Sequence, residues 1–567
     1  MNRLPIAITF RFFIALTLLL TGSGTLAGEP GRTAAIAMPD RYGAEASIEI
    51  LEAGGNAMDA AIAASFALAV TYPIAGNIGG GGFLVAHING ESVFLDFREK
   101  APLAAHRDMY LDAQGEFESR RSVVGALAVG VPGTVKGMQL AHQRFGVLPW
   151  ARLLQPAIRL AREGFLVDPR LADERDAAVE FFASEVNFEQ HFSAMNAGSL
   201  FRQPQLAATL ERIAQNPDDF YRGVIATQIV AQMQRSNGLI TARDLQEYTA
   251  VWREPLIIPW RGHQILSTPP PSSGGIALAQ LLTMRDAAAK LFRGLEHNSA
   301  TYIHLLAEIE KRVFADRGDY LADPDFEDVP VAALTDSGYL RRRAMEINAE
   351  GISPAEDVQP GLESTDTTHF SVMDGDGNAV SFTYTLNWEF GSGVVVEGSG
   401  FLLNDQMDDF SAKSGVPNKF GVVGGDANAI APGKRMLSSM SPTIVLRDGV
   451  PVVVVGSPGG STIFTTVLQV ILNLFDYDMS ADAAVAATRF HHQLPAAGLI
   501  RFDNDRTIDA GLRARLERYG YQVQPNSWGV LGDVMLIVRD EQGHLSAAAD
   551  PRGWGRSAVL PLPAAVD

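Results

Sequence analysis

The feature that most constrains this fold is a β-hairpin predicted for residues 367–387. Residues 368–373 alternate as a strand does, residues 374–378 read Asp-Gly-Asp-Gly-Asn and indicate a turn, and residues 379–387 form the returning arm. Alternation places the returning side chains on two faces, with Val380, Phe382, Tyr384 and Leu386 on one and Thr383, Thr385 and Asn387 on the other. One face is therefore expected to pack against a core, and the other presents hydroxyl and amide groups.

The hairpin places Thr367 in an unusual position. If Asp374 pairs with Ala379 across the turn, Thr367 lies level with about Leu386, and Thr385 and Asn387 flank it. Within a continuous chain the hydroxyl of Thr367 is a poor nucleophile, but cleavage after Asp366 would add a free α-amine that can act as its base. Threonine is also common in strands for structural reasons alone, so the pattern leaves both interpretations open.

Helical and strand patterns alternate along the rest of the chain. Residues 321–366 are acidic, weakly periodic and rich in proline and glycine, so we expect an exposed loop that tolerates a cut, and we expect a coil after residue 549. Strands covered by helices predict a layered α+β architecture. Helices are predicted at 44–53, 57–70, 151–163, 206–215, 276–291, 300–320, 461–474 and 512–519, and further strands at 83–88, 92–97, 441–446, 451–455, 534–538 and 545–549.

The first 27 residues differ from the rest. Arg3 and Arg11 supply positive charge, residues 12–20 are almost wholly apolar, and residues 25–27 (Thr-Leu-Ala) provide a cleavage site for a signal peptidase. A membrane anchor is the alternative, but the apolar run is shorter than the ~20 residues that a spanning helix needs. We therefore expect a secreted or periplasmic bacterial protein without a membrane anchor.

Composition excludes several classes of function. The chain has no cysteine, which rules out a disulfide framework, a lipoprotein anchor and thiolate chemistry. The formal net charge of −19 argues against nucleic acid or an anionic membrane surface as a partner. His491 and His492 are adjacent and lack the spacing of metal ligands, so a structural role is expected for both.

Two further segments can bind charged groups. The glycine-rich residues 456–461 join a strand to a helix, where free N–H groups can hold an oxyanion or a phosphate, although no nucleotide-binding motif is present. Arg98 and the pair Ser438-Ser439 suit a carboxylate, and the segment 406–409 (Gln-Met-Asp-Asp) suits an ammonium group. Taken singly, each of these is also compatible with an ordinary turn or a solvated surface.

Together these segments resemble the γ-glutamyltranspeptidases, which are N-terminal-nucleophile hydrolases. The similarity covers nearly the whole mature chain and includes residues 77–82, 95–102, 367–372, 383–387, 404–410, 437–443 and 456–460. It implies a four-layer αββα sandwich and autocatalytic cleavage between Asp366 and Thr367. The products would be a large subunit, 28–366, and a small catalytic subunit, 367–567, which remain associated as a heterodimer.

The resemblance also implies an activity. Thr367 would attack the γ-carbonyl of glutathione or another γ-glutamyl compound, and water, an amino acid or a peptide would then accept the γ-glutamyl group, with no metal or organic cofactor. Thr385 would orient Thr367, and N–H groups of Gly459 and Gly460 would bind the oxyanion. The substrate α-carboxylate would meet Arg98, Ser438 and Ser439, and the α-ammonium would meet Asn387, Gln406 and Asp409.

Two departures from the family pattern and two alternatives remain. Phe420 stands where relatives with a lid loop carry a tyrosine, and the motif does not fix Asp366. One alternative is an acylase of the same superfamily that acts on non-glutamyl amides such as glutaryl compounds. Because these lack the ammonium group, they would leave Asp409 as a buried unpaired carboxylate, which is costly. The other alternative is an exported binding protein that is never cleaved.

Overall fold

The computed structural model describes residues 32–354, 368–413, 425–494, 496–504, 506–527 and 529–562. The predicted signal sequence at 1–27, both residues of the predicted cleavage site (Asp366 and Thr367) and Phe420 lie outside these residues.

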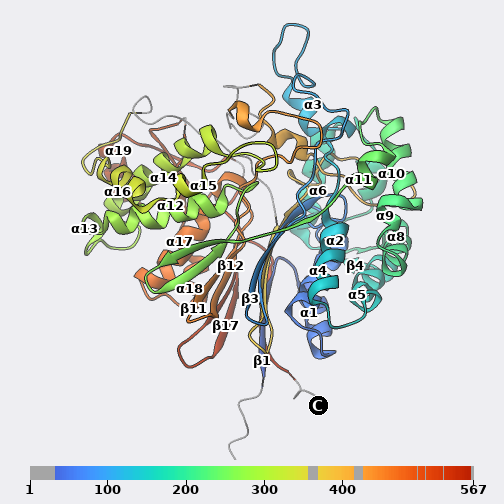
Figure 1. Cartoon of the computed structure of the whole chain (residues 1–567), viewed down its shortest axis with the longest axis horizontal. Coiled ribbons are helices and arrows are strands. Elements are labelled where there is room, and N and C mark those ends of the chain that lie inside the picture. The colour runs from blue at the N-terminus through green and yellow to red at the C-terminus, as the bar shows by residue number, and fades with distance from the viewer. Residues whose placement is uncertain are drawn as a thin grey trace, which may run out of the picture.

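Two antiparallel sheets lie face to face at the centre of the molecule (Figure 1). The first has seven strands in the order β18-β1-β9-β10-β2-β3-β6, and the second has six in the order β17-β16-β12-β11-β8-β7. The strands of the first are β1 (Thr33–Met38), β2 (Gly81–Ile88), β3 (Glu91–Asp96), β6 (Val251–Arg253), β9 (Thr368–Met373), β10 (Ala379–Thr385) and β18 (Arg556–Pro561). Those of the second are β7 (Leu256–Trp260), β8 (His263–Ser267), β11 (Thr443–Arg447), β12 (Val450–Gly456), β16 (Met535–Arg539) and β17 (Leu545–Ala549).

Helices cover the outer face of each sheet, as Figure 1 shows. The first sheet packs against α1 (Arg41–Glu52), α2 (Ala57–Thr71) and α4 (Thr134–Phe145), while α5 (Trp150–Glu163) packs on α2, and α8 (Pro204–Gln215) packs on α5. The second packs against α12 (Gly274–Ala287), α17 (Ile463–Asp476) and α18 (Ala481–Ala486), while α14 (Ala300–Tyr320) packs on α12, and α19 (Ala510–Tyr519) packs on α14. A third apolar cluster lies between the sheets and includes Phe83, Phe94, Ile444 and Val454. The predicted α+β, four-layer αββα sandwich is confirmed.

Shorter elements complete the chain. The remaining helices are α3 (Ser119–Val123), α6 (Pro169–Phe182), α7 (Phe188–Phe192), α9 (Asp219–Arg222), α10 (Val224–Arg235), α11 (Ala242–Glu247), α13 (Ala289–Phe292), α15 (Val331–Leu334) and α16 (Ser337–Met345). Two small sheets contain β4 (Phe165–Leu166) with β5 (Leu200–Phe201), and β13 (Phe490–His491) with β14 (Leu499–Phe502) and β15 (Gln522–Pro525).

The predicted hairpin is β9 and β10, but its register differs by one residue. Met373, not Asp374, pairs with Ala379, and Thr368 pairs with Tyr384. Asp374 leaves the strand because its carboxylate accepts hydrogen bonds from the backbone N–H of Asp376 (2.9 Å) and Asn378 (3.0 Å), which closes the turn. This side-chain capping of the turn could not be read from alternation alone.

The two faces of β10 separate as predicted. Val380, Phe382, Tyr384 and Leu386 belong to the core beneath the helices. The opposite face is buried between the sheets, where Ser381 Oγ donates to the carbonyl of Val455 (3.1 Å) and Thr383 Oγ1 lies 2.8 Å from His369 Nδ1. Hydrogen bonds thus satisfy these polar groups inside the sandwich.

Two predicted irregular regions contain regular elements, so the expected loop at 321–366 and the expected coil after residue 549 were wrong for those parts, while the tolerance to a cut stays a prediction. In the described part of 321–366, Asp336 caps α16 by accepting from the N–H of Tyr339 (2.7 Å), and Leu340 and Ala344 pack into the core of the second sheet. Two apolar residues are enough to dock a short helix but too few to produce a clear period. The C-terminal tail forms β18, which pairs antiparallel with β1, a long-range contact that local pattern does not encode.

Candidate active site

The end of β10 is held by close backbone packing. Thr385 pairs with Gly81 of β2, where an added Cβ would lie 2.5 Å from the carbonyl oxygen of Phe97, so only glycine fits. Asn77 Nδ2 donates to the carbonyl of Thr385 (2.9 Å), and Thr385 Oγ1 accepts from the N–H of Asn387 (2.8 Å). These contacts fix a buried threonine hydroxyl at the last residue of β10, next to Tyr384, which pairs with Thr368.

Asn387, two residues after Thr385, is hydrogen-bonded to Asp405. Asn387 has a left-handed φ of 87°, and its side-chain nitrogen donates to the carbonyl of Asp405 (3.2 Å). Asp405 Oδ1 accepts from the N–H of Trp388 (3.0 Å), while burial raises the pKa of Asp405 well above its usual value. Asp405 had no predicted role, although it lies inside the matched segment 404–410.

Arg98, Gln406 and Asp409 lie together in the interior. Arg98 follows β3, is 1% exposed and forms an ion pair with Asp409. The same carboxylate oxygen of Asp409 accepts from Gln406 Nε2 (2.6 Å). The guanidinium of Arg98 also donates to the carbonyls of Met436 (3.4 Å) and Leu437 (3.2 Å), which places it beside Ser438. We call Arg98, Gln406, Asp409, Ser438 and Ser439 the head-group pocket.

Four buried atoms of the head-group pocket make no hydrogen bond within the described residues, although Arg98 Nη1 lies 3.6 Å from Glu99 Oε2 in an ion pair. Two belong to groups that can donate, Arg98 Nη1 and Ser439 Oγ, and two are acceptors, Gln406 Oε1 and Asp409 Oδ1. Leaving buried polar atoms unpaired is costly, so such a cluster indicates that a ligand completes it. Donors next to acceptors match a ligand that carries both a carboxylate and an ammonium group.

The glycine turn lies between β12 and α17. Gly459 and Gly460 have φ values of 123° and 55°, and a Cβ on Gly459 would lie 2.4 Å from Thr462 Oγ1. Thr462 closes the turn by donating from its N–H (3.0 Å) and hydroxyl (2.8 Å) to the carbonyl of Gly459. Among the described residues no acceptor takes the N–H of either glycine, and both precede α17, whose positive dipole end favours an anion.

Three other buried titratable groups are Glu99, His491 and Arg317. Glu99 is completely buried, and burial raises its pKa to about 7. His491 lies 3.0 Å from Thr465 Oγ1 and 2.9 Å from Gln493 Oε1, and burial lowers its pKa to about 3, so it is neutral and structural at ordinary pH. Glu99 had no predicted role although it lies inside the matched segment 95–102, and no sequence pattern indicated Arg317, which also lies near the head-group pocket.

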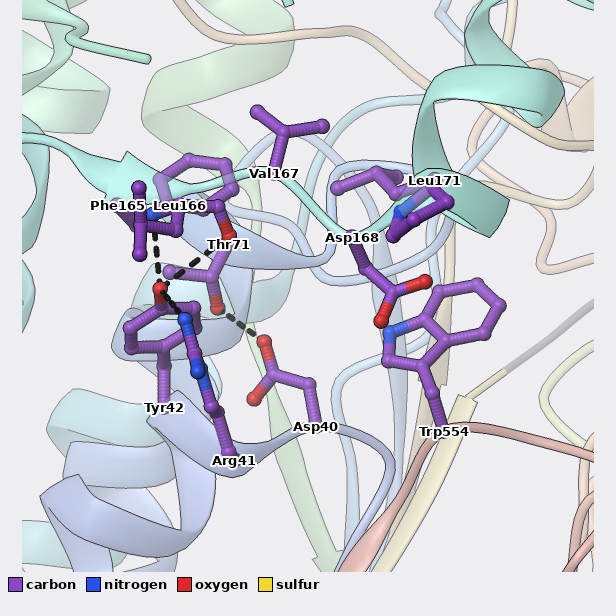
Figure 2. A pocket seen from close by; sticks show the side chains of 11 residues that line it. Asp40, Arg41, Tyr42, Thr71, Phe165, Leu166, Val167, Asp168, Leu171 and Trp554 are labelled. Carbon is purple, nitrogen blue, oxygen red and sulfur yellow. Dashed lines mark hydrogen bonds between the residues drawn. The ribbon is translucent and has the colours of Figure 1, made fainter. Parts of the chain in front are cut away.

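A separate pocket of about 300 Å³ lies between the start of α1, the β4–α6 turn and Trp554 (Figure 2). None of the predicted site residues lines it. Its buried carboxylate, Asp40, already accepts from the N–H of Gly43 (2.7 Å) and from the hydroxyl of Thr71, and burial raises its pKa to about 6. Asp40 thus caps α1, and each of its two oxygens already has a partner within the protein.

Comparison with known proteins gives consistent matches. The γ-glutamyltranspeptidase family profile matches residues 43–560. The glutathione hydrolase proenzyme of Pseudomonas aeruginosa is 56% identical over 527 residues, which cover 93% of this chain and 94% of that protein. The γ-glutamyltranspeptidase of Pseudomonas nitroreducens, solved in complex with L-DON, is 55% identical with a TM-score of 0.56, over 57% of this chain and 97% of that chain. The cephalosporin acylase of Bacillus halodurans is 29% identical with a TM-score of 0.82, over 93% of this chain and 96% of that chain.

Proposed function

This chain belongs to the γ-glutamyltranspeptidase family, and we propose how its residues perform the reaction of that family. The protein is an enzyme that transfers γ-glutamyl groups from glutathione and related γ-glutamyl amides to water or to an acceptor amine.

The substrate is assigned from the four buried atoms of the head-group pocket that make no hydrogen bond within the described residues. A γ-glutamyl group ends in an α-carboxylate and an α-ammonium group. Arg98 Nη1 and Ser439 Oγ would donate to the carboxylate, and Gln406 Oε1 and Asp409 Oδ1 would accept from the ammonium. Ser438 would add a second hydroxyl on the carboxylate side, and Asn387 would complete the ammonium side. Arg98 and Asp409 form an ion pair, and the zwitterionic substrate would give each a further partner of opposite charge.

Maturation would begin at the bond between Asp366 and Thr367. The hydroxyl of Thr367 attacks the carbonyl of Asp366, the amide bond breaks, and water hydrolyses the resulting ester to give subunits 28–366 and 367–567. Two comparisons support this step. The P. aeruginosa relative is described as a proenzyme, and the P. nitroreducens chain is matched over 97% of its length by only 57% of this chain.

Catalysis would then use the new N-terminus. The Thr367 amine takes the proton from its own hydroxyl, Thr367 Oγ attacks the γ-carbonyl, and the N–H groups of Gly459 and Gly460 stabilise the oxyanion. Collapse of the intermediate expels the amine of the leaving group, which receives the proton, and leaves a γ-glutamyl ester. Water or an acceptor amine cleaves this ester and regenerates Thr367. Thr385 would orient the nucleophile.

An acylase of non-glutamyl amides remains the competing function, because a cephalosporin acylase is among the solved structures that match 93% of this chain. The structure also weakens one argument against it. Asp409 would not be left wholly unpaired by a glutaryl substrate, since Arg98 and Gln406 already contact one of its oxygens. The ammonium would still be needed to satisfy Asp409 Oδ1, and we therefore retain the γ-glutamyl assignment.

We place the mature enzyme in the periplasm or the medium, on the basis of the signal pattern in residues 1–27. Across the described ranges, no helix has the length and apolar character required to cross a bilayer.

Denaturing electrophoresis of the purified protein, together with hydrolysis of γ-glutamyl-p-nitroanilide, tests the proposal. We expect two bands for the wild type and one for Thr367→Ala, with activity only in the cleaved protein. A single wild-type band identical to that of the variant would instead support the uncleaved binding protein.

A further inference from the structure

A buried arginine outside the predicted site connects to both halves of the head-group pocket. Arg317 lies in the last turn of α14 and is 5% exposed. We propose that Arg317 is a positioning residue that acts through Ser273 to hold the Ser438–Ser439 turn in the orientation that binds the substrate carboxylate. This role rests on the proposed γ-glutamyl specificity and adds residues to which neither the sequence pattern nor the family resemblance assigned a function.

The connection is a short relay of hydrogen bonds. Arg317 Nε donates to Ser273 Oγ (2.9 Å), and the same hydroxyl donates onward to the carbonyl of Ser438 (2.9 Å). The backbone N–H of Ser273 donates to that carbonyl as well (2.7 Å). The guanidinium of Arg317 polarises the Ser273 hydroxyl and so strengthens the hydrogen bond from that hydroxyl to the carbonyl of Ser438. The carbonyl of Ser438 is therefore held by two hydrogen bonds from Ser273, one of which is strengthened by charge.

The segment that carries Ser273 is locked against the serine turn. The N–H of Ser438 donates to the carbonyl of Pro271 (2.9 Å), and Ser272 Oγ donates to the carbonyl of Met440 (2.7 Å). A Cβ at Gly274 would lie 2.1 Å from Ser441 Oγ, so only glycine permits this approach. Backbone contacts therefore set the position of the two segments, and the relay from Arg317 acts on the peptide group next to the Ser439 hydroxyl.

Arg317 is also electrostatically linked to the ammonium side of the pocket. Burial lowers the pKa of Arg317 well below its usual value, and the negative charge of Asp409 opposes that shift. Arg98 pairs directly with Asp409, so this carboxylate lies in the field of two buried guanidinium groups. Lysine would keep the charge of Arg317 but place its donors differently, because it lacks the planar fork.

The test compares cleaved wild-type enzyme with Arg317→Gln, Arg317→Lys and Ser273→Ala. The readouts are kcat and KM for γ-glutamyl-p-nitroanilide and the competitive inhibition constant of L-glutamate, which contains the same head group. If the relay positions the carboxylate-binding turn, KM and the inhibition constant rise together, roughly 10- to 100-fold for Arg317→Gln and about 3- to 10-fold for Ser273→Ala, with kcat within about threefold of wild type. Arg317→Lys should fall between Arg317→Gln and wild type.

Arg175→Gln is the matched control. Arg175 in α6 is also buried. It donates to the carbonyls of Phe192 (3.2 Å) and Ser193 (2.8 Å) and to Asn196 Oδ1 (3.1 Å), and it forms an ion pair with Asp176 (2.8 Å). It should lower stability without changing KM or the inhibition constant. The proposal is overturned if the Arg317 and Ser273 variants behave like this control, or if none of them is cleaved, which would assign the pair to folding or maturation. Absence of γ-glutamyl hydrolysis in the cleaved wild type would reject the proposed function instead.

Discussion

Replacement of Asp409 by asparagine separates γ-glutamyl recognition from general acylase activity. The side chain of Asp409 is 4% exposed, one oxygen is shared by Arg98 and Gln406, and the other has no partner within the described residues. Asparagine keeps the shape but removes the charge that would meet the substrate ammonium. A glutaryl substrate keeps the carboxylate of the head group and lacks the ammonium, so it reports on everything except this interaction.

The magnitude follows from the loss of one charge-assisted contact in a water-excluded site. Hydrogen bonds to charged groups contribute about 1.5–3 kcal/mol, and each 1.4 kcal/mol corresponds to about a factor of ten. We therefore expect kcat/KM for a γ-glutamyl anilide to fall roughly 10- to 150-fold in Asp409→Asn. The variant also removes one of the two anionic partners of Arg98, the other being Glu99 at 3.6 Å. The guanidinium of Arg98 becomes more available to a carboxylate, and the rate with a glutaryl anilide should be unchanged or higher.

The assay measures p-nitroaniline release from the two anilides by cleaved wild type and by cleaved Asp409→Asn. The ratio of the two kcat/KM values is the informative quantity, because it cancels the fraction of active enzyme. An equal loss on both substrates would refute the reasoning, since it would mean that Asp409 supports the fold of the pocket and does not read the ammonium. Equal wild-type rates on the two anilides would also contradict it.

Three further outcomes are expected. Thr367→Ala should remain a single band on a denaturing gel and lack activity, and spontaneous cleavage of this variant would exclude Thr367 as the nucleophile of maturation. Gly459→Ala, which forces a Cβ to within 2.4 Å of Thr462 Oγ1 at a φ of 123°, should lower kcat about 100-fold or more with a smaller change in KM, and a full wild-type kcat would remove this turn from the oxyanion site. Burial lowers the pKa of His369 from 6.5 to about 3, so the unfolded chain binds a proton there that the folded chain refuses as the pH falls from 6.5 towards 3. The stability of the wild type relative to His369→Gln should therefore decrease over that range in urea titrations, and a constant difference would show that the histidine does not titrate as described.

The fold was predictable where pattern and turn chemistry agree. Residues 545–549 were predicted as a strand and form β17, and the helix expected at 300–320 is α14. The hairpin register was wrong because of a local turn cap by Asp374, whereas the other two errors arise because a distant partner decides the structure. The tail becomes β18 only because β1 offers it an edge, and α16 forms because Leu340 and Ala344 meet the core of the second sheet.

The site was predictable as far as it is encoded in contiguous motifs. The matched segments supplied Arg98, Gln406 and Asp409, and the structure brings these three into contact. The ion pair between Arg98 and Asp409 was not foreseen, because opposite charges about 300 residues apart leave no local signal. Arg317 was missed for a similar reason, since an arginine at the end of an amphipathic helix ordinarily faces solvent. Asp366, Thr367 and Phe420 remain predictions from sequence.

The strand order of the first sheet has a consequence for maturation. Strands from before and after residue 367 interleave, so β1 pairs with β18 and β9, and β10 pairs with β2. In the second sheet β11 pairs with β8 in the same manner. The uncut precursor would fold in a unimolecular reaction. After the cut, refolding would be bimolecular, because the two separate subunits must associate. The melting temperature of the mature enzyme would depend on its concentration, whereas that of the precursor would not. Each enzyme molecule would thus be assembled once, at the high effective concentration that its own linker provides.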